Sequence, residues 1–375
     1  MHDTTPESGS TPDTDHTPEI VHVRLPADRP PWTPTGLNVE AGEQITVLGS
    51  GFVRWSSKRE VGAGAKFHLW GRVPGGRVFK GTADTTTVTV DHAGELELCV
   101  LRGVWADDLG TLRSSTRLYD GLEGGLEATV LRWPVGVDPL AGIAALLDRA
   151  DPGDRAEPGE PGEPGGLDAR LDPVLLRAEH HRLSHPIEHP AGWTHFRDLG
   201  RTDIFRADTL DGAAAIAVRC DDDAGIVQRA VKFPLDPTTT IEWAWRVDTL
   251  PSSVAEDTKM THDYVSIAVE FDSGRDLTWF WSAALEPVES TFACPMPGWH
   301  KRETHMPLHC GADGLGRPHR ERRNVWEDHR RFMGEPPGRI VAVWLIAASN
   351  CGRTVGTATF ADIVLRNDTG ELRVL

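Results

Sequence analysis

The sequence has few of the residues that commonly mark a reaction type or a cross-linked scaffold. Its 375 residues include five cysteines, two tyrosines and five methionines. The cysteines are odd in number, widely scattered and without Cys-x-x-Cys spacing, which argues against a disulfide framework and a cysteine-rich zinc motif. No nucleophile elbow, phosphate-binding loop or dinucleotide fingerprint occurs, so no reaction class follows from a motif. No segment reaches the roughly 18 apolar residues that a membrane span requires.

Basic residues are also scarce. The 39 Lys and Arg stand against 56 Asp and Glu, which leaves a formal net charge of -17. This charge repels phosphate backbones and anionic lipid headgroups, so we expect neither nucleic acid nor a membrane surface as a partner. Residues 1–20 are rich in Thr, Pro, Asp and Ser without an apolar core segment, which predicts a disordered tail and no signal peptide. With the scattered cysteines, this favours a cytoplasmic protein.

Tryptophan, in contrast, is abundant, with 13 residues against two tyrosines. Its side chain offers a large apolar area and one N–H donor, which suits both sandwich cores and platforms that stack on sugars. We expect most of these tryptophans to lie in cores.

Short β-like runs alternate with Gly-, Asp- and Ser-rich turns from residue 21 onward. In residues 96–100 and again in residues 126–130, an apolar residue recurs at every second position. This pattern indicates a sheet with one buried and one wet face. The chain length suits two domains. We therefore predict an all-β fold of two β-sandwich domains, of jelly-roll or galactose-binding-like type, with a few short helices.

Helix signals and an acidic segment separate the two halves. Asp138-Pro139 and Asp172-Pro173 each combine an N-cap residue with a proline suited to the first helical turn. Between them, residues 151–166 repeat Glu-Pro-Gly three times, which predicts a solvated, semi-extended spacer. The predicted organisation is a disordered tail (1–20), a galactose-binding-like β-sandwich (21–137), helices with an acidic Gly/Pro linker (138–192) and a second β-sandwich (193–375).

The second half carries the strongest strand patterns. They cover residues 240–247, 263–271, 277–284, 340–347 and 357–365. One helix is expected among them over residues 324–333, with Asn324 as its N-cap.

The first half resembles the galactose-binding lectins of the PA-I type. The resemblance rests on residues 36–47 (Gly-Leu-Asn-Val-Glu-Ala-Gly-Glu-Gln-Ile-Thr-Val), on Gly49-Ser50-Gly51 and on the strand at 125–133. It covers residues 21–137 and implies a galactose-binding-like sandwich. The family binds sugar through calcium, but the loop that precedes the last strand differs here, so the calcium ligands do not transfer one by one. Calcium stays open as a cofactor, and none is assigned.

The second half resembles a bacterial family of domains of unknown function, family 3047. The shared elements are residues 242–247 (Glu-Trp-Ala-Trp-Arg-Val), Asp263-Tyr264, residues 323–328 (Arg-Asn-Val-Trp-Glu-Asp) before Gly334-Glu335-Pro336-Pro337, and Ala361-Asp362-Ile363. They occur in the expected order over residues 193–366. The resemblance implies a β-sandwich and no activity, because sandwiches host many functions.

One face of the strongest strands predicts a ligand pocket. Glu242 and Arg246 share a face of one strand with small residues, and Tyr264 and Glu270 do so on another. Small side chains leave room above a sheet, and the charges can orient a polar ligand. Trp279 and Trp281 on the neighbouring strand are added as ligand-binding candidates. The alternative is an ordinary wet face with cross-strand ion pairs.

The segment 299–310 concentrates imidazoles, a carboxylate and a thiol. In an extended chain, Glu303 and His305 project to the same side, and His262 and Asp263 can complete a site from a neighbouring strand. Histidine shuttles protons near neutral pH and a carboxylate can orient it, so these four residues are our catalytic candidates. The spacing matches no known metal motif, so we assign no metal ligands, and Pro307 is expected to break the strand. Surface or hydrogen-bonded structural histidines are the alternative.

Two charged segments are weaker candidates. Arginines gather at 317–323 and at Arg330 and Arg331, where they can face a carboxylate or phosphate of a ligand or simply pair with nearby acids. The three acids at 221–223 can bind calcium or be an exposed turn.

These observations predict a protein that binds a carbohydrate or another polar small ligand. One alternative is a cofactor-independent lyase or cyclase that acts on a small metabolite in the second domain. The other is a structural interaction module. Whether the chain is an enzyme stays undecided at this point.

Overall fold

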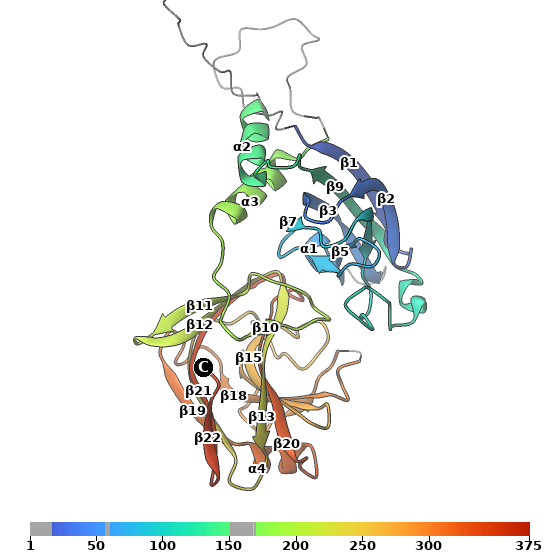
Figure 1. Cartoon of the computed structure of the whole chain (residues 1–375). Helices are drawn as coiled ribbons and strands as arrows, with labels where there is room; N and C mark the ends of the chain where they lie inside the picture. Colours follow the sequence, from blue (N-terminus) through green and yellow to red (C-terminus); the bar gives the residue numbers. More distant parts are fainter. Residues whose placement is uncertain (1–16, 57–60, 151–167, 169, 297) are drawn as a thin grey trace, which may run out of the picture.

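The computed structural model describes residues 17–56, 61–150, 168, 170–296 and 298–375. They form two β-sandwich domains, with two helices beside the first (Figure 1). The predicted all-β class with a few short helices is confirmed. The predicted tail is shortened, because Glu19 and Ile20 already belong to strand β1. Its first sixteen residues and the Glu-Pro-Gly repeat lie outside the described residues.

The first domain packs a five-stranded sheet against a four-stranded sheet. The first sheet has the order β1 (Glu19–Pro26), β9 (Glu123–Arg132), β3 (Gln44–Ser56) and β4 (Val61–Ala63), with β7 (Thr85–Thr89) also paired to β3. The second has the order β2 (Trp32–Val39), β8 (Gly94–Val100), β5 (Leu69–Arg72) and β6 (Phe79–Lys80). Helix α1 (Ala65–His68) and the 3-10 helix η1 (Thr116–Tyr119) lie in the connections. The alternating residues Leu96, Leu98, Val100, Leu126, Ala128 and Val130 share one core, as their period of two predicts.

His68 of α1 is built into this domain as a neutral ring. Its Nδ1 donates to the carbonyl of Leu101 at 2.8 Å, and its Nε2 accepts from Trp55 Nε1 at 3.0 Å. Burial lowers the pKa of His68 to about 4. Because a protonated Nε2 cannot accept from Trp55, the native contacts require the neutral form.

Two helices cover the outer face of the five-stranded sheet. They are α2 (Pro139–Ala150) and α3 (Pro173–Ser184), and Asp172 caps α3 by accepting from Val174 N, as predicted. Their apolar residues form one cluster with Leu48 and Leu131 of the sheet. Both helices that flank the Glu-Pro-Gly repeat therefore pack on the first domain. None of the helices in the described part of the chain has the length and apolar character needed to span a bilayer.

A buried carboxylate ties α3 to the sheet. Glu179 accepts from Thr85 Oγ1 at 2.7 Å and from Thr87 Oγ1 at 2.6 Å, both on β7. Arg182, one turn later, donates to both carboxylate oxygens at 2.8 and 2.6 Å. Burial alone would raise the pKa of Glu179, but the hydrogen bonds from Arg182 and Thr87 lower it overall. The carboxylate is thus held ionised and fully paired.

The second domain packs a seven-stranded sheet against a six-stranded sheet. The seven-stranded sheet has the order β10 (Thr194–His195), β13 (Ala224–Pro234), β20 (Arg339–Ala348), β15 (Tyr264–Phe271), β16 (Asp276–Ser282), β18 (Glu303–Cys310) and β17 (Phe292–Ala293). The six-stranded sheet has the order β11 (Phe205–Leu210), β12 (Ala213–Asp221), β21 (Val355–Asn367), β14 (Thr240–Thr249) and β19 (His319–Asn324), with β22 (Gly370–Arg373) paired to β21. Helix α4 (Val325–Phe332) follows β19 and is capped by Asn324, as predicted. Strands β16 and β18 pair in parallel.

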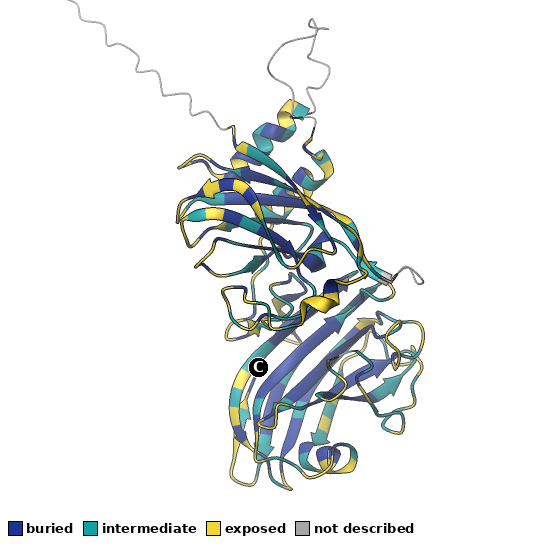
Figure 2. Cartoon of the chain, turned by 90° about the vertical axis from the view of Figure 1, so that its right-hand side faces the viewer, coloured by how far each residue is buried: buried dark blue, intermediate teal, exposed yellow. Residues whose placement is uncertain are grey.

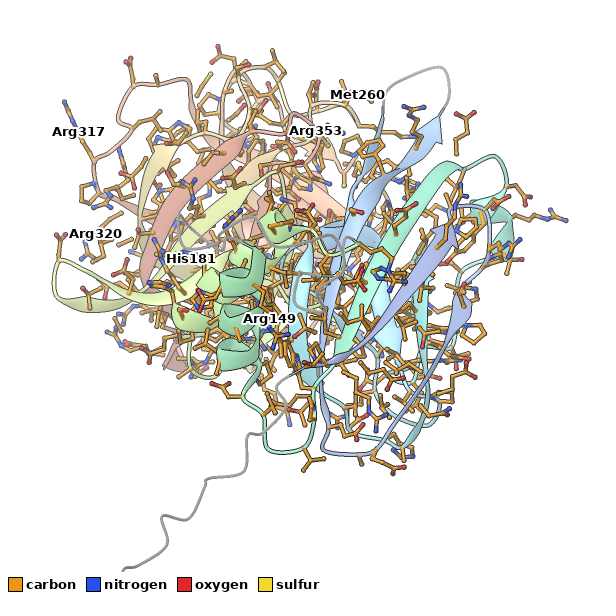
Figure 3. The ribbon with its side chains drawn as sticks, turned by 90° about the horizontal axis from the view of Figure 1, so that it is seen from above. Arg149, His181, Met260, Arg317, Arg320 and Arg353 are labelled. Atoms are coloured by element: carbon orange, nitrogen blue, oxygen red, sulfur yellow. The ribbon has the colours of Figure 1, made fainter. Side chains whose placement is uncertain are left out.

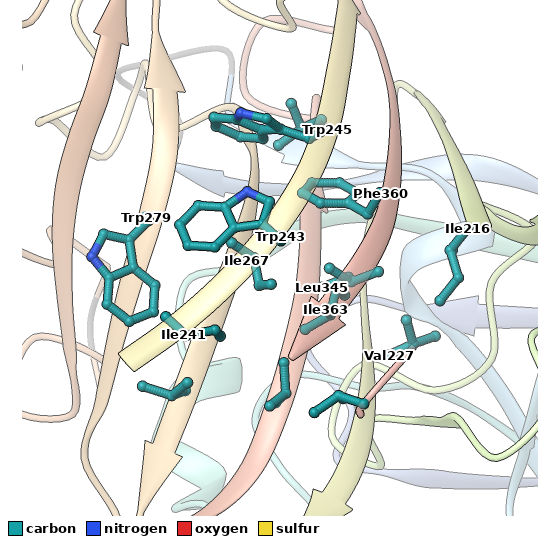
Figure 4. Packing of buried hydrophobic residues seen from close by; sticks show 14 of the residues in the cluster. Ile216, Val227, Ile241, Trp243, Trp245, Ile267, Trp279, Leu345, Phe360 and Ile363 are labelled. Carbon is teal, nitrogen blue, oxygen red and sulfur yellow. The ribbon is translucent and has the colours of Figure 1, made fainter. Parts of the chain in front are cut away.

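A row of tryptophans fills the space between these two sheets. Trp243 and Trp245 of β14 meet Trp279 and Trp281 of β16, with ring centroids 5.8 and 5.9 Å apart. Figure 4 shows Trp243, Trp245 and Trp279 with the aliphatic residues around them. Buried residues run along the central strands of the domain (Figure 2). The interpretation of most tryptophans as core residues therefore holds for this row.

Two lysines of the first domain are among the residues that contact the second domain. Lys80, which is largely buried, donates to the carbonyl of Arg201 at 3.4 Å. Lys66 donates to the carbonyl of Asp221 at 2.9 Å. The acidic turn 221–223, considered above for calcium, thus faces lysines of the first domain.

We predict that the Glu179→Gln substitution destabilises the first domain. The substitution leaves Arg182 without its charged partner in a half-buried position, which costs about 3 kcal/mol of the free energy of unfolding. Urea unfolding of the full chain measures this loss. Glu188→Gln, on an exposed residue beyond α3, is the control and should change stability by less than about 0.5 kcal/mol. Equal effects of the two substitutions would contradict the assigned role.

We also predict that acid destabilises the protein through His68. The folded pKa of about 4 lies below the usual histidine pKa of 6.5, so the unfolded chain takes up the proton first as the pH falls. The contribution is complete above pH 6.5 and is lost between pH 6.5 and about 4, by about 3 kcal/mol in total. Urea unfolding at a series of pH values should show a smaller pH dependence in His68→Gln than in the wild type. The exposed His92, changed to Gln, serves as the control and should keep the wild-type slope.

Candidate functional site

The four residues predicted to line one pocket lie on opposite faces of the second domain. Strand β14 turns its tryptophans into the core, so Glu242 and Arg246 face outward from the six-stranded sheet. Strand β15 turns Val265 and its alternate residues into the same core, so Tyr264 and Glu270 face outward from the other sheet. The prediction of a shared pocket is wrong. Alternation shows which residues of one strand share a face, but not how faces of separate strands meet.

Trp279 and Trp281 are core residues and offer no stacking platform. They are 0% and 1% exposed. Their indole N–H groups donate to Asp328 Oδ2 at 3.1 Å and to the carbonyl of Gly311 at 2.9 Å. The structure therefore places both predicted ligand-binding residues in the core, where the facing sheet covers their rings.

With one exception, the predicted catalytic residues gather beneath the connection between β16 and β18, which packs on the outer face of the seven-stranded sheet. His262, Cys294, Glu303 and His305 each offer one donor atom, and these atoms all lie within 4.8 Å of one another. All four residues are between 0% and 5% exposed. We call this group the closed site. Sequence reasoning found three of its members and passed over Cys294.

Strand register explains how these residues meet. Glu303 and His305 are two residues apart on β18 and project to the same side, as predicted. His262 lies two residues before the start of β15. Cys294 follows β17, which pairs antiparallel with β18, and its N–H donates to the carbonyl of Glu303 at 3.0 Å. Because β17 has only two residues, it is too short to produce an alternating pattern from which the sequence could predict it.

The protonation states of the closed site suit a cation. His262 Nδ1 donates to the carbonyl of Glu256 at 2.7 Å, so its Nε2 lone pair faces Cys294 Sγ at 3.4 Å. Burial lowers the pKa of His262 to about 3, which keeps the ring neutral. Burial and the nearby Glu303 raise the pKa of the Cys294 thiol. Bringing a cation next to the sulfur would favour the thiolate.

His305 is held on every side. Its Nε2 lies 3.3 Å from Glu303 Oε2, which is longer than the usual distance for a nitrogen–oxygen hydrogen bond. Its Nδ1 is buried without a partner. Phe292 stacks on the ring at 5.4 Å, and Tyr264 contacts it edge-on at 4.9 Å. Tyr264 thus forms a wall of the closed site instead of a ligand pocket.

The donor set fits a transition metal. Two imidazoles, a thiolate and a carboxylate are ligands that zinc uses, whereas calcium requires oxygen ligands. Tetrahedral zinc with ordinary bond lengths separates neighbouring ligand atoms by about 3.4 to 3.6 Å. The His262–Cys294 and His305–Glu303 separations of 3.4 and 3.3 Å come close to these values. Four protein ligands leave no open coordination position.

Asp263, the remaining catalytic candidate, has a different task. Its carboxylate accepts from the backbone N–H groups of Cys351 at 3.0 Å and Gly352 at 2.6 Å. It thereby anchors the turn that precedes β21, and its hydrogen bonds do not involve the closed site. Its prediction as a member of that site is wrong, since neighbouring residues of an extended chain point in opposite directions.

An arginine-lined groove, which we call the arginine groove, lies on the outer face of the six-stranded sheet. It has a volume of about 360 Å³ and is lined by Glu242, Trp243, Arg320, Glu321, Arg322, Asp362, Val364, Arg366 and Arg373. Arg320 pairs with Asp362 at 2.9 Å, and Arg322 and Arg366 each approach Glu242 at 3.4 Å. Figure 3 shows Arg320 at the outer rim of the second domain. Of the predicted ligand-binding residues, Glu242 alone lines this groove.

Arg246 and Glu270 are engaged elsewhere. Arg246 pairs with Asp248 at 2.9 Å, and Glu270 pairs with Arg302 at 3.0 Å. In the first domain, the lectin-like loop uses Asp107 to accept from the N–H groups of Leu109 and Thr111. Among the described residues, the two groups of possible metal ligands both lie in the second domain.

Fold and site thus define a two-domain β-sandwich protein with a buried cluster of two histidines, a cysteine and a glutamate. Residues 191–364 match the model of a family described as protein of unknown function (DUF3047). The resemblance stated for the second half is confirmed. No curated protein matches the chain.

The solved structures that are similar to this chain include a lectin, a xyloglucanase domain and an endoglucanase. The chain is similar to the EclA N-terminal domain, a PllA-like lectin, with 19% identity, 30% of this chain and 95% of that chain covered, and a TM-score of 0.24. It is also similar to the xyloglucanase domain of NopAA from Sinorhizobium fredii, in complex with cellobiose, with 10% identity, coverage of 48% and 95%, and a TM-score of 0.30. Endoglucanase 3 of Trichoderma harzianum, from family GH12, matches with 8% identity, coverage of 48% and 93%, and a TM-score of 0.29. The match to the PllA-like lectin falls in the N-terminal region, where the lectin resemblance was stated.

Proposed function

We propose that the second domain binds a divalent transition metal ion, with zinc as the best fit, at the closed site. The observation that carries the proposal is the convergence of His262, Cys294, Glu303 and His305 within 4.8 Å in the interior. A carboxyl group and polar rings are costly to bury without a compensating charge. A divalent cation supplies that charge and turns the cost into binding free energy.

The ion would act as a clamp. Cys294 lies in the connection between β16 and β18, whose residues Leu285, Phe292 and Trp299 pack on the apolar outer face of the seven-stranded sheet, whereas Glu303 and His305 lie on β18. One ion bound to these three residues would hold the connection between β16 and β18 against the apolar outer face of the sheet. A site closed by four protein ligands stabilises structure and leaves no position for a substrate. The reduced thiol that it needs agrees with the cytoplasmic location that we propose.

The acid/base alternative for the same residues is less well supported. A lyase or cyclase needs its substrate within hydrogen-bonding reach of the acid or base. All four residues are buried, and Phe292 lies flat on His305. The closed site offers no access of that kind.

A second function, the binding of a polar anionic ligand, is favoured by the arginine groove. Four arginines line it, against three acidic residues, Glu242, Glu321 and Asp362. Arginine donates two parallel hydrogen bonds to a carboxylate or phosphate. We propose an acidic sugar as the occupant, which narrows the carbohydrate or polar ligand expected from the sequence.

The metal proposal predicts that the purified full chain retains zinc. Cys294→Ser should weaken zinc binding by at least about 100-fold, because a direct ligand contributes more than the outer-shell groups whose loss costs 10- to 100-fold. Competition with a chromophoric chelator measures the affinity, and cobalt substitution should add a sulfur-to-cobalt absorption band. Cys310→Ser is the matched control and should keep both. A chain that binds no zinc or cobalt would contradict the proposal.

The groove proposal predicts that glucuronate binds and that glucose does not. Arg322→Gln should weaken glucuronate binding about tenfold through the loss of a charged hydrogen bond. Calorimetry at low salt measures both affinities. Arg246→Gln, on the same sheet face but outside the groove, is the control and should bind like the wild type. Equal affinities for glucose and glucuronate, or equal losses in the two variants, would count against the proposal.

A further inference from the structure

A second group of possible metal ligands lies where the ends of the two sheets meet. His309 comes from the end of β18, and His319 and Glu321 come from β19 across the connecting loop 311–318. One donor atom from each lies within 4.8 Å of the others. The side chains of His309 and Glu321 are 27% and 18% exposed, unlike those of the closed site. Sequence reasoning noted their segments but did not bring these three residues together.

Each of the three side chains is positioned by a further contact. His319 Nε2 donates to the carbonyl of Gly314 at 3.0 Å, so its Nδ1 keeps a lone pair in the neutral ring. Metal-bound histidines are usually oriented by such a bond from their other nitrogen. Glu321 Oε1 accepts from Trp245 Nε1 at 3.1 Å and lies 2.7 Å from His309 Nε2. Neither of these bonds uses Oε2.

Aromatic packing fixes the imidazole rings. Trp281 stacks on His309 with ring centroids 4.2 Å apart and meets His319 edge-on at 5.1 Å. Gly314, at φ +94°, lets the loop come close to His319, because a Cβ there would lie 2.9 Å from the ring. The loop and the tryptophan thus hold both rings at a centroid separation of 5.0 Å.

The carboxylate carries the charge that a cation needs. Without a cation, the His309–Glu321 contact is an ordinary hydrogen bond. When a cation is bound, Glu321 can offer its second oxygen, Oε2, and His309 can offer the lone pair of its unprotonated ring nitrogen.

We propose that His309, His319 and Glu321 form an open metal site that binds a divalent ion and leaves one coordination position to solvent. Two histidines and one glutamate are a ligand set that zinc uses where the fourth position is taken by water or substrate. The partial exposure of all three side chains provides that access. A small oxyanion such as phosphate or a carboxylate is the ligand class that suits the fourth position. The site does not depend on the closed site, since the two share no residue.

Cobalt titration of the full-length Cys294→Ser protein tests this inference. Because this variant has lost the only thiol among the two groups, its cobalt spectrum should show ligand-field bands without a sulfur-to-cobalt band. Inorganic phosphate should shift these bands by occupying the open position. The closed site is followed separately in the wild type through its sulfur band, so a failure of one site does not imply a failure of the other.

Two further substitutions in the Cys294→Ser protein test whether its cobalt spectrum comes from His309, His319 and Glu321. His319→Gln and Glu321→Gln should each weaken cobalt binding at least tenfold; the second keeps an acceptor for Trp245 and serves where the first disturbs the loop. His300→Gln, on an exposed residue, is the control and should leave binding unchanged. Cobalt binding that persists in both variants, an absence of binding, or a spectrum insensitive to phosphate would each overturn the proposal.

Discussion

The packing of tryptophans between the two sheets of the second domain decides where polar side chains can lie. Trp243, Trp245, Trp279 and Trp281 occupy the inter-sheet space that a jelly roll can otherwise use as a ligand cleft. Because these indoles fill that space, charged side chains can lie only on the outer faces of the two sheets or where the ends of the sheets meet. The edge positions are themselves set by the indoles, because Trp245 and Trp279 donate to Glu321 and Asp328. Buried indole N–H groups usually find such acceptors, although Trp243 Nε1 of the same row has none.

The outer face of the seven-stranded sheet is not left to charged residues, because connecting segments of the second domain pack on it. An apolar layer on this face includes Tyr264, Ala268, Phe280 and Trp344. It packs against residues of the connecting segments, namely Phe196, Leu199, Leu285, Phe292 and Trp299. The closed site lies beneath one of these segments, so a polar cluster stands within an apolar layer. In such surroundings charges interact strongly, and a single divalent ion can balance several polar groups. The arginine groove on the other outer face is open to water, where ion pairs contribute little to stability.

The sequence allowed the strands and part of the closed site to be predicted, for identifiable reasons. The strand pattern over residues 240–247 and the two-residue spacing of Glu303 and His305 are local features, and the structure shows both. The position of Cys294 depends on a two-residue strand and a long connection, which leave no periodic signal. Pro307, expected to break β18, lies inside it, because the pairing with β16 shifts register just beyond that residue. Register between distant segments is decided by packing, which local patterns do not contain.

The acidic Gly/Pro segment was taken from the sequence as the joint between the domains, yet the helices on either side of it both belong to the first. Helix α3 is fastened to β7 through Glu179, and α2 rests on Trp133. The chain passes to the second domain only after α3 ends at Ser184. The connection between the two sandwiches is therefore the stretch from α3 to β10, so the length of that stretch, and not the acidic repeat, sets how far apart the two sandwiches can lie.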